Sequence, residues 1–495
     1  MVLLFSIVFL CTSCAGLQRE NPSSNAETAN YQISFDEALA EINARHKSII
    51  KPTFDVGEFE TRYVRDKAPR EFKLEKTPIS EKAGYLSAAQ MKRDAYILVH
   101  NLRNGYSLYD YYGGDEKFDA VLADIEAAVT EAGEMDTVSF NYLLSTSFSF
   151  IEDQHFAIGG WNFAPRLVTA FYRETAFGKT DGKYVNLKTG KSVKSVEGFP
   201  ELDALFRLSL SNDYQLVYYP VIQISVPYLE LADKYHKGIQ KEAAENLQLT
   251  YSDDSTQELP GFIDYWGITA FSPAEADIHE TDGIPVLRTT QFSQVSQRDM
   301  MRFLNENTHQ TSLVVDLRRN PGGDMVTGAQ WFERYTGCEV GRNIYSVFFG
   351  SLEKVISDLS IFGKHMKDYL QGVGNKYAVI GGEEDVFIEN PDRLLVVLMS
   401  KFTSSAAEVF IDYGHNVENV LFVGDASHGC MINNQAYSSI KLPCSYLPFS
   451  MGTSVCVPPD EDYFREGRGF LPDIWVPAEE AEELICGFLQ QMQSK

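Results

Sequence analysis

The sequence lacks the features that define several large classes of protein. Lysine and arginine number 43 against 69 aspartates and glutamates. The resulting net charge of −26 argues against a nucleic-acid partner, because such a partner calls for basic patches. No segment has the composition of a disordered tract, and we find no internal repeat. The 495 residues are therefore expected to fold as a globular protein of about three domains.

Cysteine is also scarce, with seven residues in the whole chain. Beyond residue 14 the remaining number is odd, which leaves no complete disulfide framework, and none has the CxxC spacing of a zinc site. Cys444 and Cys456 flank a predicted hairpin. One bridge between them, in an oxidising compartment, and no bridge at all are the two alternatives.

Long hydrophobic runs are missing after the first residues. Residues 2–13 are apolar, but they are too few to span a bilayer and are typical of the core of a secretory signal. Cys14 follows Thr12-Ser13 as in a bacterial lipoprotein cleavage site, which predicts a signal over residues 1–14 and a polar tether over 15–33. We expect an exported lipoprotein of the cell envelope, periplasmic or on the outer surface, with plain secretion as the alternative.

Helical periodicity dominates the next part of the chain, and we predict a helical domain over residues 34–160. Ser34 and Glu37 form a capping-box pattern, and residues 88–104 and 115–132 have amphipathic spacing. Each of these helices has only one apolar side, so they are expected to pack together as a small bundle.

Strand patterns and glycine turns dominate residues 161–275. The alternation in LQLTY, followed by the polar SDDST turn, predicts antiparallel hairpins, and the Lys/Glu-rich stretch Tyr228–Asn246 predicts a helix. The sequence leaves two interpretations open for this segment: a PDZ-like module that binds peptides, and a packing platform.

From Ile284 onward, predicted strands alternate with predicted helices. The strands lie at 284–290, 312–318, 394–400 and 419–425, and the helices at 297–307 and 326–335. This alternation indicates an α/β layer whose strands are at least partly parallel.

The stretch Lys401–Phe410, KFTSSAAEVF, has the composition of a strand-to-helix turn that carries a nucleophile. Ser405 lies near the start of the predicted helix, where free backbone N–H groups and the positive helix end favour an oxyanion. The simpler interpretation is that Ser404 and Ser405 only cap the helix.

Three motifs follow one another along this α/β segment. They are DLRRNPGGD at 316–324, TSSAAEVF at 403–410 and REGRGFLPDIWV at 465–476. Their order resembles the serine peptidase family of tail-specific (C-terminal processing) and tricorn-core type, over roughly residues 284–477. The resemblance implies a mixed α/β fold with a crotonase-like (ClpP/crotonase) catalytic domain, for which we predict the boundaries 276–495.

The resemblance also assigns roles to individual residues. Ser405 matches the nucleophile because it directly precedes the A-A-E of the motif. Ser404 is the alternative candidate for the nucleophile. The loop at Gly322 and Gly323 is implied as the source of one oxyanion donor, and the amide of Ala406 as the other.

The general base departs from the commoner family pattern. Cys430 occupies the position of the lysine that ends G-E-x-T-x-G-K, and a thiol is no base unless its pKa is strongly lowered. The tricorn-like branch implies a Ser–His–Glu arrangement instead, with His155 of the I-E-D-Q-H stretch and Glu466 of the closing motif. His155 would take the proton of Ser405, while Glu466 fixes its tautomer directly or through a polar relay. His428 is the alternative candidate for the general base.

Structural alternatives exist for the same residues. His155 also fits a hydrogen-bonded histidine at a domain junction, and Glu466 fits an ion pair with Arg465 or Arg468 that braces a loop. Asp316 and Asn320 are expected to fix the glycine loop, and Asp473 the closing strand.

These observations predict a serine peptidase that hydrolyses peptide or protein substrates through an acyl-enzyme at Ser405. The resemblance implies no metal and no organic cofactor, and membrane contact is expected only through a lipid anchor at Cys14. The alternative is a catalytically inactive protein on the same fold that binds peptides or other ligands, which Cys430 in the lysine position favours.

Overall fold

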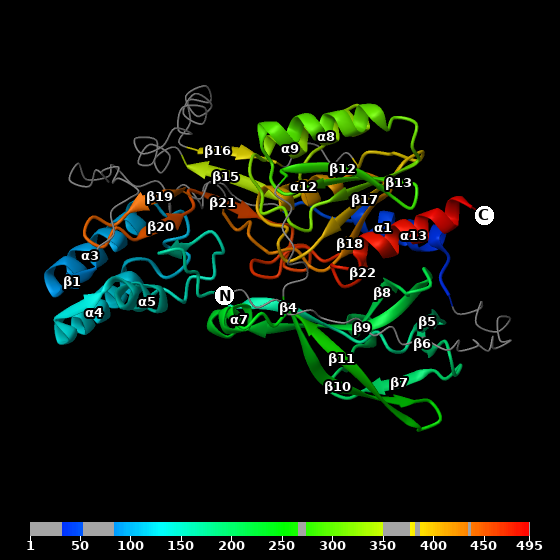
Figure 1. Ribbon diagram of the computed structural model, residues 1–495, viewed down its shortest axis with the longest axis horizontal. Helices are drawn as coiled ribbons and strands as arrows, with labels where there is room; N and C mark the ends of the chain where they lie inside the picture. Colours follow the sequence, from blue (N-terminus) through cyan, green and yellow to red (C-terminus); the bar gives the residue numbers. More distant parts are fainter. Residues whose placement is uncertain are drawn as a thin grey trace, which may run out of the picture.

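The computed structural model describes residues 32–52, 84–265, 274–349, 377–381, 387–433 and 437–494. A helical region, a β-rich middle segment and an α/β region lie around a common centre (Figure 1). The expected signal over residues 1–14, and the expected tether as far as residue 31, lie outside the described residues. Within the described part, no helix is both long enough and apolar enough to span a membrane.

The helical region contains the two amphipathic helices expected from the sequence and a third one. They are α3 (Ala88–Gly105), α4 (Gly114–Ala132) and α5 (Thr137–Ser147), and the short strands β1 (Tyr85–Ser87) and β2 (Glu134–Asp136) pair beside them. Leu98, Phe118 and Phe140 are buried in their shared core. The predictions for residues 88–104 and 115–132 are therefore confirmed.

The first described helix, α1 (Phe35–Lys47), begins with the expected capping box of Ser34 and Glu37. It does not join the helical bundle, so that expectation was wrong for this helix. Its apolar side packs instead on the parallel sheet of the α/β region and on α13 (Ala481–Gln493), where the Phe35 and Phe488 rings are 5.4 Å apart. The physical reason is that this face of the sheet is apolar and needs a cover.

The middle segment forms one antiparallel sheet. Its strands are β4 (Arg166–Phe171), β5 (Phe177–Thr180), β6 (Lys183–Asn186), β7 (Val193–Val196), β8 (Phe206–Leu210), β9 (Leu216–Val226), β10 (Lys241–Tyr251) and β11 (Thr256–Asp264). The order along the sheet is β6-β5-β9-β4-β11-β10-β7, with β8 paired to β9. The predicted hairpin is β10–β11, whose turn contains Asp254 with φ 61°.

The helix predicted over Tyr228–Asn246 is wrong in its second half. Helix α7 spans only Tyr228–His236, and Gly238 follows it with φ 67°. Residues from Lys241 onward pair with β11 as strand β10, because eight register pairs with that partner outweigh the helix propensity of the Lys/Glu-rich sequence.

The α/β region is built on a six-stranded sheet, as the alternating pattern predicts, and it is called the catalytic region below after the role expected from the sequence. Its order is β12 (Ala276–Thr281), β13 (Ile284–Thr289), β14 (Ser312–Asp316), β17 (Leu394–Met399), β18 (Val420–Gly424) and β22 (Ile474–Trp475). All neighbours are parallel except β12 and β13. Helices α8 (Gln294–Glu306), α9 (Val326–Thr336) and α12 (Ala406–Gly414) cover one face, and α1 and α13 cover the other (Figure 1).

The pleat of β17 explains how both faces are filled. Leu395 and Val397 belong to the core under α8, α9 and α12, whereas Val396 and Leu398 belong to the core under α1 and α13. On the first face the rings of Phe332 and Phe410 are 4.6 Å apart. This contact fixes α12, and with it the turn that carries Ser405.

Two smaller sheets join the regions. One contains β15 (Tyr345–Phe349), β16 (Tyr377–Ile380) and β21 (Ser454–Val457), and the other contains β19 (Tyr437–Lys441), β20 (Pro448–Met451) and β3 (Ala157–Ile158). The β20–β3 pairing brings the end of the helical region onto the catalytic region. Cys444 and Cys456 form no disulfide, so the bridge considered from the sequence is not formed.

Candidate active site

The candidate residues gather at one edge of the catalytic sheet. Strands β14, β17 and β18 are parallel neighbours, so their carboxyl ends meet at this edge. The loops that follow them are the glycine loop (residues 317–325), the serine turn (400–405) and the third loop (425–430). Open α/β sheets bind ligands at this end of their strands.

Ser405 sits in a strained turn between β17 and α12. Its φ of 54° and ψ of −120° lie in a region that only glycine adopts readily, at a cost of about 1–3 kcal/mol for another residue. The strained backbone turns the hydroxyl toward the helical region, where the Ser405 Oγ lies 3.1 Å from Nε2 of His155.

His155 reaches the serine from the segment between α5 and β3. Oδ1 of Asp153 accepts its backbone N–H at 2.8 Å, and the Ser450 hydroxyl donates to its carbonyl at 2.7 Å. Burial lowers the pKa of His155, and the negative charge of Asp153 opposes that effect. Its Nδ1 is buried and has no hydrogen-bond partner among the described residues.

The glycine loop lies directly against the serine turn. Gly322 and Gly323 have φ of 110° and 129°, and a Cβ on Gly322 would lie 2.9 Å from both the Ala406 nitrogen and the Ser405 Cβ. The N–H of Gly322 donates to Oδ1 of Asn320 at 2.9 Å, which confirms the expected role of that asparagine. The N–H groups of Gly323 and Ala406 make no hydrogen bond within the described residues.

Hydrogen bonds tie the serine turn to the glycine loop. The Thr403 hydroxyl donates to the Leu317 carbonyl at 2.8 Å, and the Ser404 hydroxyl donates to the Pro321 carbonyl at 3.0 Å. Ser404 is thus bonded to the glycine loop, whereas the Ser405 hydroxyl faces His155.

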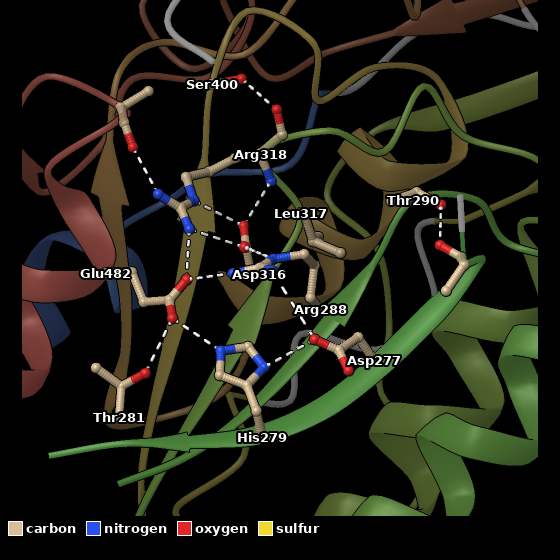
Figure 2. A network of polar contacts seen from close by, with 12 residues as sticks. Asp277, His279, Thr281, Arg288, Thr290, Asp316, Leu317, Arg318, Ser400 and Glu482 are labelled. Atoms are coloured by element: carbon tan, nitrogen blue, oxygen red, sulfur yellow. Dashed lines mark hydrogen bonds and ion pairs between the residues drawn. The ribbon is translucent and has the colours of Figure 1, made fainter. Parts of the chain in front are cut away.

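An ionic network holds the root of the glycine loop (Figure 2). Arg318 donates to both carboxylate oxygens of Asp316 at 2.8 Å and to Glu482 of α13 at 2.6 Å. Arg288 of β13 bridges the same two acids. Burial would raise the pKa of Asp316, but the Arg318 charge and the hydrogen bonds from Arg318 and Arg288 together outweigh burial and lower the pKa to about 2. The acid therefore stays ionised and fixes the strand end, as expected from the sequence.

Glu408 is a buried carboxylate beneath the serine turn. It accepts the backbone N–H of Ser405 at 3.0 Å, the Ser427 hydroxyl at 2.6 Å, and the N–H groups of Gly429 at 2.7 Å and Cys430 at 2.9 Å. Burial raises the pKa of Glu408 to about 7, although these four donors oppose the rise. One side chain thus links the serine turn to the third loop.

Glu466 is half-buried and does not contact the His155 ring. Its Oε1 accepts the N–H of Gln154 at 2.9 Å, and its Oε2 accepts those of Met431 at 2.9 Å and Ile432 at 2.8 Å. Burial and the Asp153 charge raise the pKa of Glu466 well above its ordinary value. Among the described residues it forms no ion pair with Arg465 or Arg468, in contrast to the bracing alternative.

The remaining candidates lie beside the site without contacting the serine hydroxyl. His428 is bonded through Nδ1 to the Lys401 carbonyl at 2.8 Å and through Nε2 to Arg166. Burial and the Arg166 charge lower the pKa of His428 to about 3. Burial and the neighbouring carboxylates raise the pKa of the Cys430 thiol well above its usual range, so the thiol stays protonated.

Sequence reasoning assigned no role to two residues that the structure brings to this site. Asp153 lies two positions before His155, and Glu408 is the glutamate of the quoted A-A-E motif. Both acidic residues lie within stretches quoted in the sequence analysis, but only the fold shows which atoms their carboxylates contact. Within the described part of the chain, no group of three or more histidine, cysteine or acidic residues is arranged to hold a metal.

A largely apolar cavity of about 400 Å³ opens beside the serine turn. Phe402 and His428 line it on the catalytic side, and Tyr228 and Leu231 of α7 line it on the side of the middle segment, with Arg166 between them. The cavity is therefore shared by the middle segment and the catalytic region.

Comparison with known proteins agrees with the expectation from the motifs. The sequence model of peptidase family S41 matches residues 283–476, so this part of the chain is similar to that family. The match includes Ser405, the glycine loop and Glu466, whereas His155 lies outside it. No curated protein sequence matches the chain.

Solved structures of peptidases are similar to this chain at low sequence identity. Mature CPAF is 13% identical, with 82% of this chain and 96% of that chain covered and a TM-score of 0.42. The photosystem II D1 C-terminal processing protease is 13% identical, with 80% and 96% covered and a TM-score of 0.36. The tricorn protease is 10% identical, with 82% of this chain and 37% of that chain covered and a TM-score of 0.36.

The strain at Ser405 predicts a difference between two substitutions that both remove the hydroxyl. Ser405→Gly should give a protein whose free energy of unfolding is about 1 kcal/mol higher than that of Ser405→Ala. Glycine relieves the backbone strain at φ 54°, and the greater conformational entropy that it gives the unfolded chain offsets part of this gain. Denaturant titration of both variants measures the difference. An alanine variant as stable as the glycine variant would show that the turn is unstrained.

The burial of Glu408 predicts a pH dependence of stability. Its pKa of about 7 in the folded protein exceeds its ordinary value of 4.5, so between these pH values the folded state binds more protons than the unfolded state. The free energy of unfolding should therefore fall as pH rises through this window, by on the order of 2–3 kcal/mol relative to Glu408→Gln. Denaturant titrations of both proteins from pH 5 to 7.5 measure it, and a constant difference between them would contradict the assignment.

Proposed function

We propose that the protein is a serine peptidase in which Ser405 attacks the scissile carbonyl and forms an acyl-enzyme. The observation that carries this proposal is the 3.1 Å contact between the Ser405 Oγ and Nε2 of His155, at a strained strand-to-helix turn. The family match supports a peptide or protein as the substrate.

His155 acts as general base and then as general acid. Burial lowers its pKa, so the ring is neutral near pH 7 and Nε2 accepts the hydroxyl proton as the Ser405 Oγ–carbon bond forms. The same proton then passes to the leaving amine as the C–N bond breaks. In the second half of the cycle, a water molecule loses a proton to His155 as its oxygen attacks the acyl carbon. The bond from that carbon to the Ser405 Oγ then breaks, and His155 returns the proton to the Oγ.

The oxyanion is held by backbone amides. The N–H groups of Gly323 and Ala406 are the proposed donors, and the Gly322 amide supports the loop through Asn320 instead of donating to the oxyanion. Each donor aimed at the developing charge contributes on the order of 3 kcal/mol to the stability of the transition state.

Glu466 and Cys430 define how this site differs from a serine–lysine site. We assign Glu466 an indirect part, because it holds the amide of Gln154, the residue next to His155, together with the segment at Met431. The protonated Cys430 thiol supplies no base, and a neutral histidine takes over that task.

The apolar cavity suggests which side chains the substrate presents. It lies between Phe402, three residues before Ser405, and Tyr228 and Leu231 of α7. We propose that it accepts an apolar side chain of the peptide, since burial of such a side chain contributes about 1.5–3 kcal/mol. In this role the middle segment is part of the substrate site, which fits its interpretation as a PDZ-like module better than as a packing platform.

A catalytically inactive, ligand-binding protein on the same fold is the second candidate. The observation that favours it is Cys430 in the lysine position, with a thiol that stays protonated. The contact between Ser405 and His155 opposes it, because a binding protein has no need of a strained serine beside a neutral imidazole.

We also propose export to the cell envelope with a lipid on Cys14. This proposal rests on the sequence of residues 1–14 alone, which lie outside the described residues. In a bacterial host, an alkyne-tagged fatty acid should label the protein, and Cys14→Ser should lose the label. Equal labelling of both proteins would contradict the anchor.

The proposed chemistry predicts selective covalent labelling. A fluorophosphonate probe should label the folded protein, Ser405→Ala should abolish the label, and His155→Ala should slow labelling at least 100-fold because the hydroxyl loses its base. Gel fluorescence with mass spectrometry of the labelled peptide gives the rate and the position.

Two variants serve as controls for this experiment. Ser404→Ala removes the neighbouring hydroxyl, and His428→Asn removes the alternative candidate for the general base, and both should still be labelled. A wild-type protein that stays unlabelled while folded, and that hydrolyses no peptide from a mixed pool, would support the ligand-binding alternative.

A further inference from the structure

The proposed mechanism leaves one charge to be explained. When His155 takes the serine proton, a half-buried imidazole becomes an imidazolium, and burial disfavours that charge. Glu466 is the carboxylate expected from the sequence to fix the tautomer of His155, but its oxygens accept the N–H groups of Gln154, Met431 and Ile432. The carboxylate whose charge raises the pKa of His155 is that of Asp153.

Asp153 is held rigidly beside the histidine. Its Oδ1 accepts the His155 N–H at 2.8 Å, and its Oδ2 accepts the Tyr106 hydroxyl at 2.8 Å and the side-chain amide of Asn433. Its own carbonyl accepts the side-chain amide of Asn162 at 2.9 Å. The side chain is fully buried, so water does not screen its charge from the imidazole.

We propose that Asp153 is the positioning residue of the reaction: it orients His155 through the backbone and stabilises its imidazolium by charge, whereas Glu466 acts as a clamp on backbone amides. This inference rests on the proposed function. It assigns the two carboxylates different tasks, because one faces the histidine and the other faces three amides.

Burial raises the pKa of Asp153, and the nearby His155 together with the donors around the carboxylate opposes that rise. Three N–H or O–H groups point at its two oxygens, and hydrogen bonds of this kind favour the charged form of a carboxyl. The titratable groups that surround Asp153 and His155 from the other elements are Tyr106, Tyr112, His428, Cys430 and Glu466. Burial disfavours the charged form of each of them.

Asp153→Asn is a suitable test because it removes the charge and keeps the shape. The Asn433 Oδ1 is buried without a partner in the described part of the chain, so a turned Asn433 amide can accept from the new side chain. The Tyr106 hydroxyl can likewise turn and accept. The variant is therefore expected to fold and to keep the backbone turn at His155.

The experiment measures kcat and KM of the full-length protein on a fluorogenic peptide selected from a mixed pool, from pH 5 to 9. Asp153→Asn should lower kcat about 10- to 100-fold with KM changed less than threefold. The acid limb of its kcat/KM profile should move to lower pH, because loss of a neighbouring anion lowers the pKa of His155. Titration with a fluorophosphonate gives the concentration of reactive active sites, and each rate is divided by that concentration to correct for misfolded protein.

Asp94→Asn is the matched control. Asp94 is another fully buried aspartate, and it accepts the N–H groups of Cys444 at 2.9 Å and Ser445 at 2.7 Å, away from His155. This variant should leave the acid limb in place even where it lowers stability. Glu466→Gln should lower the fraction of protein that reacts with the fluorophosphonate. It should change the pH position of the acid limb of the kcat/KM profile less.

Three results separate the outcomes. An acid limb that stays in place in Asp153→Asn would reduce Asp153 to a structural turn residue and overturn the inference. A limb that moves in Glu466→Gln and not in Asp153→Asn would give the charge role to Glu466. A wild-type protein that reacts with neither probe nor peptide would remove the proposed function itself, and the inference with it.

Discussion

The site depends on one contact between distant parts of the chain, the hydrogen bond from Ser405 to His155. The two residues are 250 positions apart, and each belongs to a different region. The pairing of β3 with β20 and the contact of Glu466 with the Gln154 amide help to hold His155 in place. The catalytic sheet alone therefore holds a serine and its amides, and the docked helical region completes the proposed site.

The same edge of the sheet concentrates buried groups that disfavour folding. The carboxyls of Glu408 and Asp153 are buried, and the carboxyl of Glu466 and the His155 ring are half-buried. Burial shifts the pKa of each of these groups against its charged form. The backbone at Ser405 adds strain. Folded proteins keep such features where function requires them, and the large apolar cores on both faces of the sheet offset their cost.

Much of the catalytic region was predictable from the sequence because its signals are local. Apolar runs such as 394–399 form buried parallel strands, and glycines at 322–323 mark a loop that tolerates no Cβ. Packing between distant segments was not predictable. Helix α1 covers the sheet because of a face that forms only in the folded state, and the strand at 241–251 prevails over a helical pattern through its pairing. The contacts of Asp153 likewise join separate segments at Tyr106, His155 and Asn433.

The central claim is that Ser405, its histidine and two backbone amides form one catalytic unit. A crystal structure of the protein after reaction with a peptidyl phosphonate tests it most directly. The claim predicts a bond from phosphorus to the Ser405 Oγ, with the phosphonyl oxygen about 3 Å from the nitrogens of both Gly323 and Ala406. It also predicts that Nε2 of His155 stays within hydrogen-bond reach of that Oγ. A phosphonate bound to another residue, or an oxygen turned away from both amides, would contradict it.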